Sequence, residues 1–479
     1  MTTPRRFDVL VIGSGPAGQK AAIQAVKAGR SVLLIEHERT VGGACVHRGT
    51  IPSKTLRESA AQATRLARDA SIWGVPPRAG VEVASLMARL DQVVAAHTHY
   101  MGRQIDRNGI ERHHGRARFL SEHVVETVTV GGDRAEFTAD VIVVATGSRP
   151  RNPPEIPIDH ENVLDSDSIL SMIYLPRSLT VLGGGVIASE YASIFARLGV
   201  RVTMIDAAPR PLRFVDAEIV ERFVGGFAAN GGRYVGGQRI ASVRWDGLSA
   251  VHTVLADGSA FASEKMLVAL GRAANVEDLA LDAAGLAVDE RGLVPVDEFC
   301  RTQQQHIYAV GDVIGPPALA SSAMEQGRRA VCHALGLEPG HPPELSPIGI
   351  YTIPEIATVG LDEGEALKRH GAILVGRARF DEVARGQIGG MTDGLLKLVA
   401  DASGHKLLGA HIVGEGATEL IHVAQMALIG GLEIDAFIEN IFNFPTLAEA
   451  YRVAALDLAE QRQGGMTGSH AGHAGERAA

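Results

Sequence analysis

The sequence predicts an α/β fold made of three parts, two of which repeat the same strand–turn–helix–strand unit. The chain has 479 residues, which corresponds to about three domains at the usual size of ~150 residues each. Apolar residues form 46% and charged residues 21% of the chain, as in a folded globular protein. Two glycine-rich turns mark the repeated units, and a proline-rich stretch at 339–347 leads into the last part.

The first copy of the repeated unit lies near the N-terminus. A buried-strand pattern at 7–12 runs into Gly13-Ser-Gly15-Pro-Ala-Gly18, and a helical stretch then leads to a second strand at 31–35, which ends at Glu36. In this context the glycines let backbone N–H groups approach a pyrophosphate at a helix N-terminus, and the carboxylate accepts hydrogen bonds from ribose hydroxyls. The first copy therefore predicts a dinucleotide site, with FAD as the candidate ligand.

The second copy repeats this order of elements. A strand at 178–182 leads into Gly183-Gly-Gly185-Val-Ile-Ala188, and a strand at 201–205 ends at Asp206, 23 positions after the first glycine as in the first copy. Ala188 stands in place of the third glycine, a position that serves helix–strand packing rather than phosphate approach. The second copy therefore also predicts a dinucleotide site.

The charges after the second copy bear on which nucleotide it binds. Asp206 suits the free 2′-hydroxyl of NAD. Arg210 and Arg213 follow closely, and they either meet the 2′-phosphate of NADP or are ordinary loop charges. The sequence leaves these two interpretations open.

The segments between and after the two copies supply the rest of the predicted fold. Helices are expected at 52–69, 83–108 and 417–430, and strands within 115–137 and at 141–144, 395–400 and 406–413. Three further turns punctuate the chain: Ala145-Thr146-Gly147, Ala269-Leu-Gly271-Arg272 and Val310-Gly311-Asp312. The alternation of strands and helix after residue 348 predicts a separate α+β domain.

The segment Gly42-Gly43-Ala-Cys45-Val-His-Arg-Gly-Thr50-Ile-Pro-Ser-Lys54 carries a family resemblance. It resembles the flavin disulfide reductases of the class-I pyridine nucleotide-disulfide oxidoreductases, dihydrolipoamide dehydrogenase above all, whose pattern is G-G-x-C-x-x-x-x-C-x-P-x-K. The resemblance extends from residue 7 to about 460, and it includes the turns at 145–147 and 311–312 and the segment 444–451.

The resemblance implies a fold of two Rossmann-like dinucleotide-binding domains and a C-terminal dimerisation domain. The implied order is an FAD-binding domain at 1–150 and 275–345, an NAD(P)-binding domain at 151–274 and a dimerisation domain at 346–463. The tail at 464–479 is rich in Gly, Ala and His with little to pack, and is expected to be disordered. A homodimer is then the minimum assembly, and a higher homo-oligomer is left open.

The same resemblance implies roles for individual residues. Lys54 and Glu190 would lie together near flavin N5, where the cation stabilises the reduced flavin and the carboxylate borders the nicotinamide. Asp312 would hydrogen-bond the ribityl chain of FAD. The other residues implied in cofactor binding are Gly42, Gly43, Cys45, Thr146, Gly147 and Gly271. The alternative is that Lys54 and Glu190 are solvated helix charges and Asp312 is a turn residue.

Two departures from the disulfide reductase pattern affect the predicted function. Thr50 stands at the position of the second redox cysteine, and a hydroxyl cannot close a disulfide with Cys45. Phe444 stands where the family places the histidine that manages thiol protons, and Glu449 therefore has no imidazole to orient. Neither Cys300 nor Cys332 occupies a motif position that would replace the missing thiol.

The chain keeps both nucleotide sites but lacks the dithiol. This pattern, together with the segments 49–54, 165–170, 349–355 and 442–446, resembles the soluble transhydrogenases of bacteria, in which the retained cysteine is also unpartnered and an aromatic residue replaces the histidine. The implied reaction is reversible ping-pong hydride transfer from NADPH to NAD⁺ through FAD. The alternatives are a dihydrolipoamide dehydrogenase, a flavin peroxidase or oxidase that cycles Cys45 through sulfenic acid, and a redox-sensing flavoprotein without turnover. Cys45 itself is interpreted either as a lone redox thiol or as a packing residue beside the flavin.

Composition excludes several other classes. A net charge of −9 without a basic block argues against nucleic acid or acidic lipid as a partner. Three cysteines indicate a reducing compartment, and the lack of a long apolar stretch at the N-terminus or elsewhere predicts a cytoplasmic protein without a membrane span. No metal site is expected, because His47, His113 and His114 lack ligand-like spacing and His470 and His473 lie in the polar tail.

Overall fold

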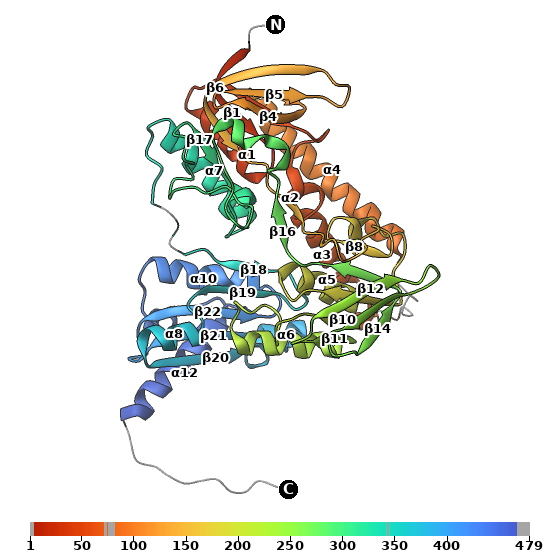
Figure 1. Ribbon diagram of the computed structural model, residues 1–479. Helices are drawn as coiled ribbons and strands as arrows, with labels where there is room; N and C mark the ends of the chain where they lie inside the picture. The colour runs from red at the N-terminus through yellow and green to blue at the C-terminus, as the bar shows by residue number, and fades with distance from the viewer. Residues whose placement is uncertain (1–3, 71–73, 75–81, 342, 344, 467–479) are drawn as a thin grey trace, which may run out of the picture. The chain divides into compact units, whose positions relative to one another are not determined.

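The computed structural model describes residues 4–70, 74, 82–341, 343 and 345–466, and the chain divides into two compact units (Figure 1). Unit 1 comprises Met1–Gly183 and Ile240–Pro342, and unit 2 comprises Gly184–Arg239 and Pro343–Ala479. The boundary therefore falls inside the predicted domain 151–274, and the domain limits given above stay a prediction.

Unit 1 is built on a seven-stranded sheet with the order β3-β2-β1-β6-β5-β4, in which β17 also pairs with β6. Its strands are β1 (Arg5–Ile12), β2 (Val32–Glu36), β3 (Glu111–His114), β4 (Arg116–Ser121), β5 (Val124–Val128), β6 (Arg134–Val144) and β17 (Ile307–Ala309). β1, β2, β3, β6 and β17 are parallel, whereas β4 and β5 add an antiparallel ribbon.

Both faces of this sheet are buried, which explains the continuous apolar pattern of its strands. Val9 and Val11 of β1 pack in one core with the alanines of α1 (Pro16–Lys27) and α7 (Ala320–Ala334). Leu10 and Ile12 pack in a second core on the opposite face. The two helices approach closely, because a Cβ placed on Gly327 of α7 would lie 2.2 Å from the carbonyl oxygen of Ala17.

The other elements of unit 1 are short sheets and helices. A parallel sheet joins β8 (Val163–Asp165), β15 (Lys265–Val268) and β9 (Ser178–Leu182), an antiparallel sheet joins β12 (Ile240–Trp245), β13 (Val251–Leu255) and β14 (Ala260–Ser263), and β7 (Ser148–Pro150) pairs with β16 (Arg272–Ala274). The remaining helices are α2 (Gly43–His47), α3 (Thr50–Asp69), α4 (Val83–Arg107), η1 (Ser168–Ser171), η2 (Glu277–Leu279), η3 (Leu281–Ala284) and η4 (Gly311–Ile314).

Unit 2 combines the helical half of the second copy with the C-terminal α+β domain. The first part contains α5 (Val186–Arg197), β10 (Arg201–Ile205), α6 (Ala217–Ala229) and β11 (Gly232–Val235), with β10 and β11 parallel. The second part is an antiparallel sheet with the order β18-β19-β22-β21-β20. Its strands are β18 (Ile348–Ile350), β19 (Ile356–Gly360), β20 (Ile373–Arg379), β21 (Leu395–Asp401) and β22 (Leu407–Val413).

The two faces of this antiparallel sheet bury different helices. Leu396 and Leu398 of β21 pack in a core with α10 (Ala417–Ile429) and α12 (Glu449–Met466), whereas Leu395 packs with α6. This alternation along β21 is the period of two expected for a strand. The other helices of the second part are α8 (Glu363–His370), η5 (Phe380–Glu382), α9 (Ala384–Gly389) and α11 (Asp435–Glu439).

The predicted tail requires one correction. It was expected to begin at residue 464, but helix α12 continues to Met466. Gly464 and Gly465 lie in the last turn, where two glycines lower the stability of an 18-residue helix only modestly. Residues 467–479, with His470 and His473, lie outside the described residues.

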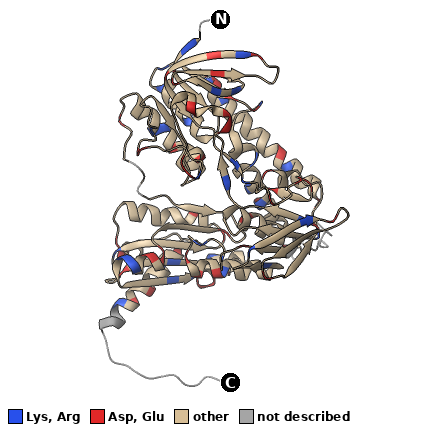
Figure 2. Ribbon diagram, viewed as in Figure 1, with Lys and Arg blue, Asp and Glu red and all other residues tan. Residues whose placement is uncertain are grey.

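Two surface properties bear on the predicted location and partners. Basic and acidic residues are interspersed along the described elements (Figure 2). Among the helices that the structure describes, none combines the length and the apolar character needed to cross a bilayer.

Candidate functional site

The first glycine turn has a backbone that only glycine fits. Gly13 has a φ of +105°, and a Cβ at this residue would lie 2.4 Å from the carbonyl oxygen of Ala145. A Cβ on Gly18 would lie 1.9 Å from the carbonyl oxygen of Gly13. Gly15, in an extended conformation, is the N-cap of α1, where nothing lies within 4 Å of an added Cβ. The turn thus presents the N-terminus of α1 and leaves room for a phosphate group.

Glu36 lies at the end of β2 beside this turn, as predicted, and its carboxylate is fully engaged. One oxygen accepts hydrogen bonds from the Ser14 N–H (3.0 Å) and the Ser14 hydroxyl (2.6 Å), and the other accepts from the Glu38 N–H (2.9 Å). Burial alone raises the pKa of Glu36, but hydrogen bonds from His37, Glu38 and Ser14 outweigh burial and lower the pKa to about 2.

The segment with Gly42 and Gly43 closes over the first turn. Gly42 has a φ of +127°, and its N–H donates to the Ser14 hydroxyl at 3.1 Å. A Cβ on Gly43 would lie 2.9 Å from the Cα of Gly15. Two motifs that are separate in the sequence therefore form one cradle.

Cys45 on α2 faces Thr50, the first residue of α3, at the position of the missing second thiol. The Thr50 hydroxyl is close enough to the Cys45 sulfur to lower the pKa of the thiol, and Lys54 lies one helical turn further along α3. Burial raises the pKa of the Cys45 thiol in spite of the nearby hydroxyl and ammonium groups. All three cysteines of the chain are free, and Cys300 and Cys332 are buried elsewhere. The site contains a neutral thiol without a second sulfur.

The turn after β6 adds an unsatisfied hydroxyl to the same cradle. Ala145 lies against Gly13, and the next side-chain oxygen, Oγ1 of Thr146, is buried without a hydrogen-bond partner among the described residues. The carbonyl oxygens of Thr146 and Gly147 accept from the Asn275 side chain (2.9 Å) and N–H (3.0 Å). A buried hydroxyl without a partner is expected where a ligand supplies the partner.

Asp312 lies at the start of η4, and its carboxylate accepts from the Ser148 hydroxyl at 2.6 Å. Arg272 donates to the same hydroxyl and to the Ser148 carbonyl oxygen, each at 2.7 Å. Gly271, which precedes this arginine, has a φ of +105°. The chain of donors from Arg272 through Ser148 fixes the direction of the Asp312 carboxylate.

The second copy has a similar turn with fewer contacts. Gly183 has a φ of +115°, Gly185 is the extended N-cap of α5, and Ala188 is fully buried. Asp206 lies over the turn, since a Cβ on Gly184 would approach its Cγ to 3.1 Å, and its Oδ1 accepts from the Ala208 N–H at 2.6 Å.

Lys54 and Glu190 lie in different units, so their predicted pairing stays a prediction. Glu190 is a buried residue of α5, and its carboxylate accepts from the Tyr351 N–H at 2.9 Å within unit 2. Glu449, which has no imidazole partner, accepts from the Thr446 N–H at 3.1 Å and so helps to start α12.

The two arginines after Asp206 differ in their surroundings. Arg210 donates to the carbonyl oxygens of Val215 (2.9 Å) and Arg213 (3.1 Å), and its guanidinium therefore closes its own loop. Arg213 is exposed, and its guanidinium makes no hydrogen bond or ion pair within the part of the chain that the structure describes. Only Arg213 presents its charge outward.

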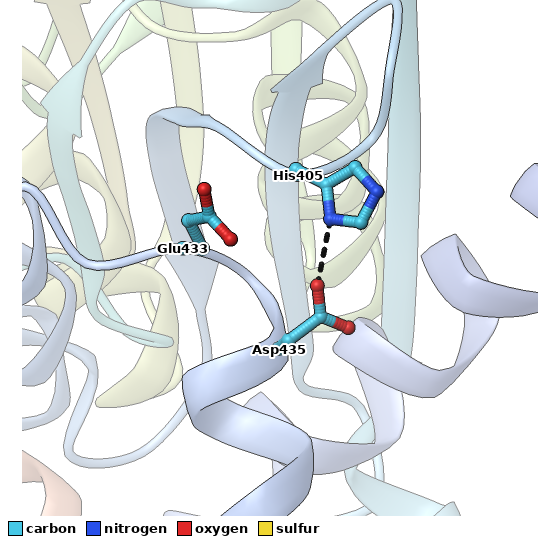
Figure 3. Close-up of side chains that lie close together, drawn as sticks. All are labelled: His405, Glu433 and Asp435. Carbon is cyan, nitrogen blue, oxygen red and sulfur yellow. Dashed lines mark hydrogen bonds and ion pairs between the residues drawn. The ribbon is translucent and has the colours of Figure 1, made fainter.

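One group of potential metal ligands was missed by the sequence analysis. His405, Glu433 and Asp435 each place a ligand atom within 4.8 Å of the others, and Figure 3 shows His405 and Asp435 in contact. Ligands this far apart in the sequence give no recognisable spacing. Arg462, however, donates to both Asp435 oxygens at 2.8 and 2.6 Å. A guanidinium already neutralises this carboxylate, so the group does not carry a metal-site proposal.

Family models match nearly the whole of this architecture. Residues 7–327 match the pyridine nucleotide-disulphide oxidoreductase model, and residues 346–455 match the dimerisation domain of the same family. The chain belongs to the pyridine nucleotide-disulphide oxidoreductase family. It is therefore an oxidoreductase that uses FAD and a pyridine nucleotide.

Several relatives named soluble pyridine nucleotide transhydrogenase are similar to the chain over nearly their full length. Soluble pyridine nucleotide transhydrogenases of Mycobacterium bovis (strain BCG / Pasteur 1173P2) and Erwinia tasmaniensis are 41% and 39% identical to it. The alignments cover 95% of this chain and 97% of the M. bovis protein, and 94% of this chain and 97% of the E. tasmaniensis protein.

Solved structures agree with the family assignment. LpdA of Mycobacterium tuberculosis is 28% identical with a TM-score of 0.86 and covers 95% of this chain and 99% of its own. The flavoprotein disulfide reductase RclA of Escherichia coli is 26% identical with a TM-score of 0.84 and covers 94% and 99%. Within the pyridine nucleotide-disulphide oxidoreductase family, the cradle of Gly13, Gly15, Gly43 and Thr146 fits FAD.

Proposed function

We propose that the chain is a soluble pyridine nucleotide transhydrogenase, which passes hydride reversibly from NADPH to NAD⁺. The observation that carries the proposal is the contact between Cys45 and Thr50, because it puts a hydroxyl where a disulfide reductase needs its second thiol. The names of the most similar relatives support the same activity.

FAD would be held in unit 1 by the cradle described above. The N-terminus of α1 would face the pyrophosphate, Glu36 would border the ribose, and Thr146 and Asp312 would supply polar contacts to the rest of the cofactor. Bound FAD supplies a two-electron carrier that accepts hydride from one nicotinamide and returns it to another.

The second copy would bind NADPH and NAD⁺ in turn. Asp206 offers a carboxylate for a free 2′-hydroxyl, and the outward charge of Arg213 suits a 2′-phosphate. Arg210 is assigned a structural role, because two of its donors bind carbonyl oxygens of its own loop and hold the guanidinium there. A site that serves two nucleotides needs both kinds of contact.

Lys54 and Glu190 would act at the reacting end of the site. Lys54 brings a positive charge close to Cys45, and Glu190 is held rigidly by the Tyr351 backbone. We assign Lys54 the electrostatic stabilisation of negative charge during the transfer and Glu190 the positioning of the nicotinamide. No protein group needs to form a bond with the substrate.

The assembly would be a cytoplasmic homodimer formed through the C-terminal domain. Residues 346–455 match a dimerisation domain, and this domain has several exposed apolar side chains on or after α10. These are Met426 (57% exposed), Ile429 (60%), Ile441 (94%) and Phe444 (75%). Apolar side chains exposed in this number are typical of a surface that pairs with another chain.

The test is turnover of the purified holoprotein with NADPH and thio-NAD⁺ in the absence of oxygen, followed by the absorbance of thio-NADH. Turnover that survives Cys45→Ser is the expected result. If the variant is inactive, the peroxidase or oxidase alternative is supported instead. Turnover with dihydrolipoamide in place of NADPH would support the dithiol alternative, and flavin that resists NADPH would contradict the proposed function.

A further inference from the structure

A buried lysine on the antiparallel sheet of unit 2 has no role in the site described so far. Lys397 of β21 is 1% exposed, and its ammonium contacts three carboxylates. The distances are 2.9 Å to Asp216, 3.2 Å to Glu218 and 2.6 Å to Glu363. The alternation of β21 places this side chain on the same face as Leu395, toward α6. Burying a charge is costly unless it is well paired, so this cluster calls for a specific reason.

Asp216 links the lysine to the loop that follows the second copy. It is almost fully buried, and its Oδ1 caps α6 by accepting from the backbone N–H groups of Glu218 (3.1 Å) and Ile219 (3.4 Å). It is also the last residue of loop 207–216, which begins directly after Asp206. Lys397 therefore fixes the point where this loop ends.

The rest of the loop is fixed at its middle. The Leu212 N–H donates to the Gly184 carbonyl oxygen at 2.8 Å, and Leu212 and Val215 are buried in a core with Ile350 and Leu395. Arg210 closes the loop from inside through Val215 and Arg213. Of the two arginines in the loop, Arg213 is the exposed one, and it lies next to the exposed Phe214.

Asp206 and the start of the loop are anchored apart from the loop's end. The Asp206 N–H donates to the Val235 carbonyl oxygen at 3.1 Å, and its carbonyl oxygen accepts from the Gln238 N–H at 3.1 Å. Its carboxylate accepts from Ala208, the second residue of the loop, whose carbonyl oxygen is held by the Gly237 N–H and the Tyr234 hydroxyl, each at 2.9 Å. The start of the loop is thus fixed to β11 and the residues after it, whereas the end of the loop is fixed by Asp216 and Lys397.

We propose that Lys397 is a positioning residue for nucleotide selectivity: by holding Asp216, it sets the loop that carries Arg213 and so favours ligands with a 2′-phosphate. This inference rests on the proposed function, in which the second copy accepts both NADP(H) and NAD(H). Charge-assisted hydrogen bonds to a phosphate depend on donor geometry, so a loosened loop weakens NADP(H) binding. Binding of NAD(H) through Asp206 is unaffected by the same change.

The test uses the double variant Lys397→Met with Asp216→Asn in the FAD-loaded protein. Changing Lys397 and Asp216 together removes the two fully buried charges, and asparagine still caps α6. The other two carboxylates, Glu218 and Glu363, are partly exposed and also contact Arg377. Binding of adenosine 2′,5′-bisphosphate and of adenosine 5′-monophosphate is measured by calorimetry, since these ligands differ only in the 2′-phosphate. We expect about tenfold weaker binding of the bisphosphate and less than twofold change for the monophosphate, as for the loss of one charge-assisted contact.

Two further measurements separate positioning from general stability. In steady state, the KM for NADPH should rise by a similar factor while kcat stays within about twofold, because the chemical step is untouched. Asp362→Asn is the matched control, since Asp362 caps α8 through the Glu365 N–H at 2.7 Å without contacting the loop. It should leave both affinities unchanged.

The outcomes distinguish this inference from the proposed function. Equal weakening of both ligands, or weakening of neither, overturns the role of Lys397 and leaves the transhydrogenase proposal intact. If the wild-type protein binds the bisphosphate no more tightly than the monophosphate, the second copy does not recognise the 2′-phosphate. That result overturns the dual use of the second copy, and the inference with it.

Discussion

The two copies of the repeated unit share a backbone but differ in what surrounds it. Gly13 and Gly183 have φ values of +105° and +115°, and Gly15 and Gly185 are both extended N-caps of the helices that follow. In the first copy the acidic residue accepts hydrogen bonds from Ser14, His37 and Glu38, and Gly42 closes over the turn. The second copy has Gly184 at the position of Ser14.

Under the proposed function, this difference would separate the site of the bound FAD from the site of the nucleotides that enter and leave. In the first copy, hydrogen bonds already hold the Glu36 carboxylate and the Gly42–Gly43 segment in place. Such a turn suits a ligand that stays bound, because few protein groups have to reorganise when the ligand binds. An acid with a single bond from Ala208 can exchange partners as nucleotides enter and leave. The same strand–turn–helix–strand unit can therefore serve either purpose, and the side chains around it decide which.

The third position of each turn provides the strongest test of this contrast. Gly18→Ala places a Cβ 1.9 Å from the Gly13 carbonyl oxygen, so the backbone must shift at a cost of about 3 kcal/mol. We expect the purified variant to carry less than about a tenth of the wild-type flavin, measured by visible absorbance per protein. Ala188→Gly is the matched change in the second copy and should keep its FAD, with a stability loss of about 1 kcal/mol. Full flavin in Gly18→Ala would show that the first turn is less constrained than we infer.

Glu36 sharpens the comparison through pH. Its folded pKa of about 2 lies below the usual value, so its stabilising contribution is present above pH ~4.5 and is lost as the pH falls toward 2. The stability that wild type loses between pH 7 and pH 3 should exceed that lost by Glu36→Gln by roughly 2 kcal/mol. Urea unfolding at the two pH values measures this difference. Parallel pH dependence in both proteins would contradict the engaged carboxylate.

Substitution of Lys54 tests whether unit 1 contributes to the rate of hydride transfer as well as to cofactor binding. Lys54→Met should slow the reduction of flavin by NADPH about tenfold or more, because one electrostatic contact to developing charge is lost. Stopped-flow absorbance without oxygen measures the rate, and Lys54→Arg, which keeps the charge, serves as the control. An unchanged rate in the methionine variant would remove Lys54 from the mechanism.

The smallest effect is expected at Cys45. Burial raises the pKa of its thiol, so it is neutral at pH 7 and a poor nucleophile. Cys45→Ser should therefore keep turnover within about twofold of wild type in the thio-NAD⁺ assay. A large loss would mean that the first site performs thiol chemistry after all.

Much of the fold could be predicted because its signals are local. The glycine turns, the acids that end β2 and β10, and helices α3, α4 and α10 follow from turn chemistry and periodicity within short windows. The fold class and the family were confirmed. The meeting of Gly43 with Gly15 could be named only through the family resemblance, because nothing in either segment specifies the other.

What the sequence did not reveal depends on distant partners. In the sequence, nothing distinguishes Lys397 from any other lysine in a strand, because its partner Asp216 lies 181 residues away. Arg210 and Arg213 look alike in the sequence, and only the folded loop shows that one of them is bound to carbonyl oxygens. The orientation of a side chain toward a remote carbonyl or carboxylate leaves no mark on local composition.

Strand β17 pairs with β6 although the two are far apart in the sequence, and this affects folding during translation. Strand β17 and helix α7 complete the first sheet and its alanine-rich core, yet they are translated long after β1 and α1. At the usual ~5–20 residues per second, the ribosome needs on the order of 10 to 30 s to pass from β6 to β17. During that interval the nascent chain has its glycine turns but neither Asp312 nor α7. If Asp312 contributes to the flavin site as proposed, products that end before β17 would emerge colourless.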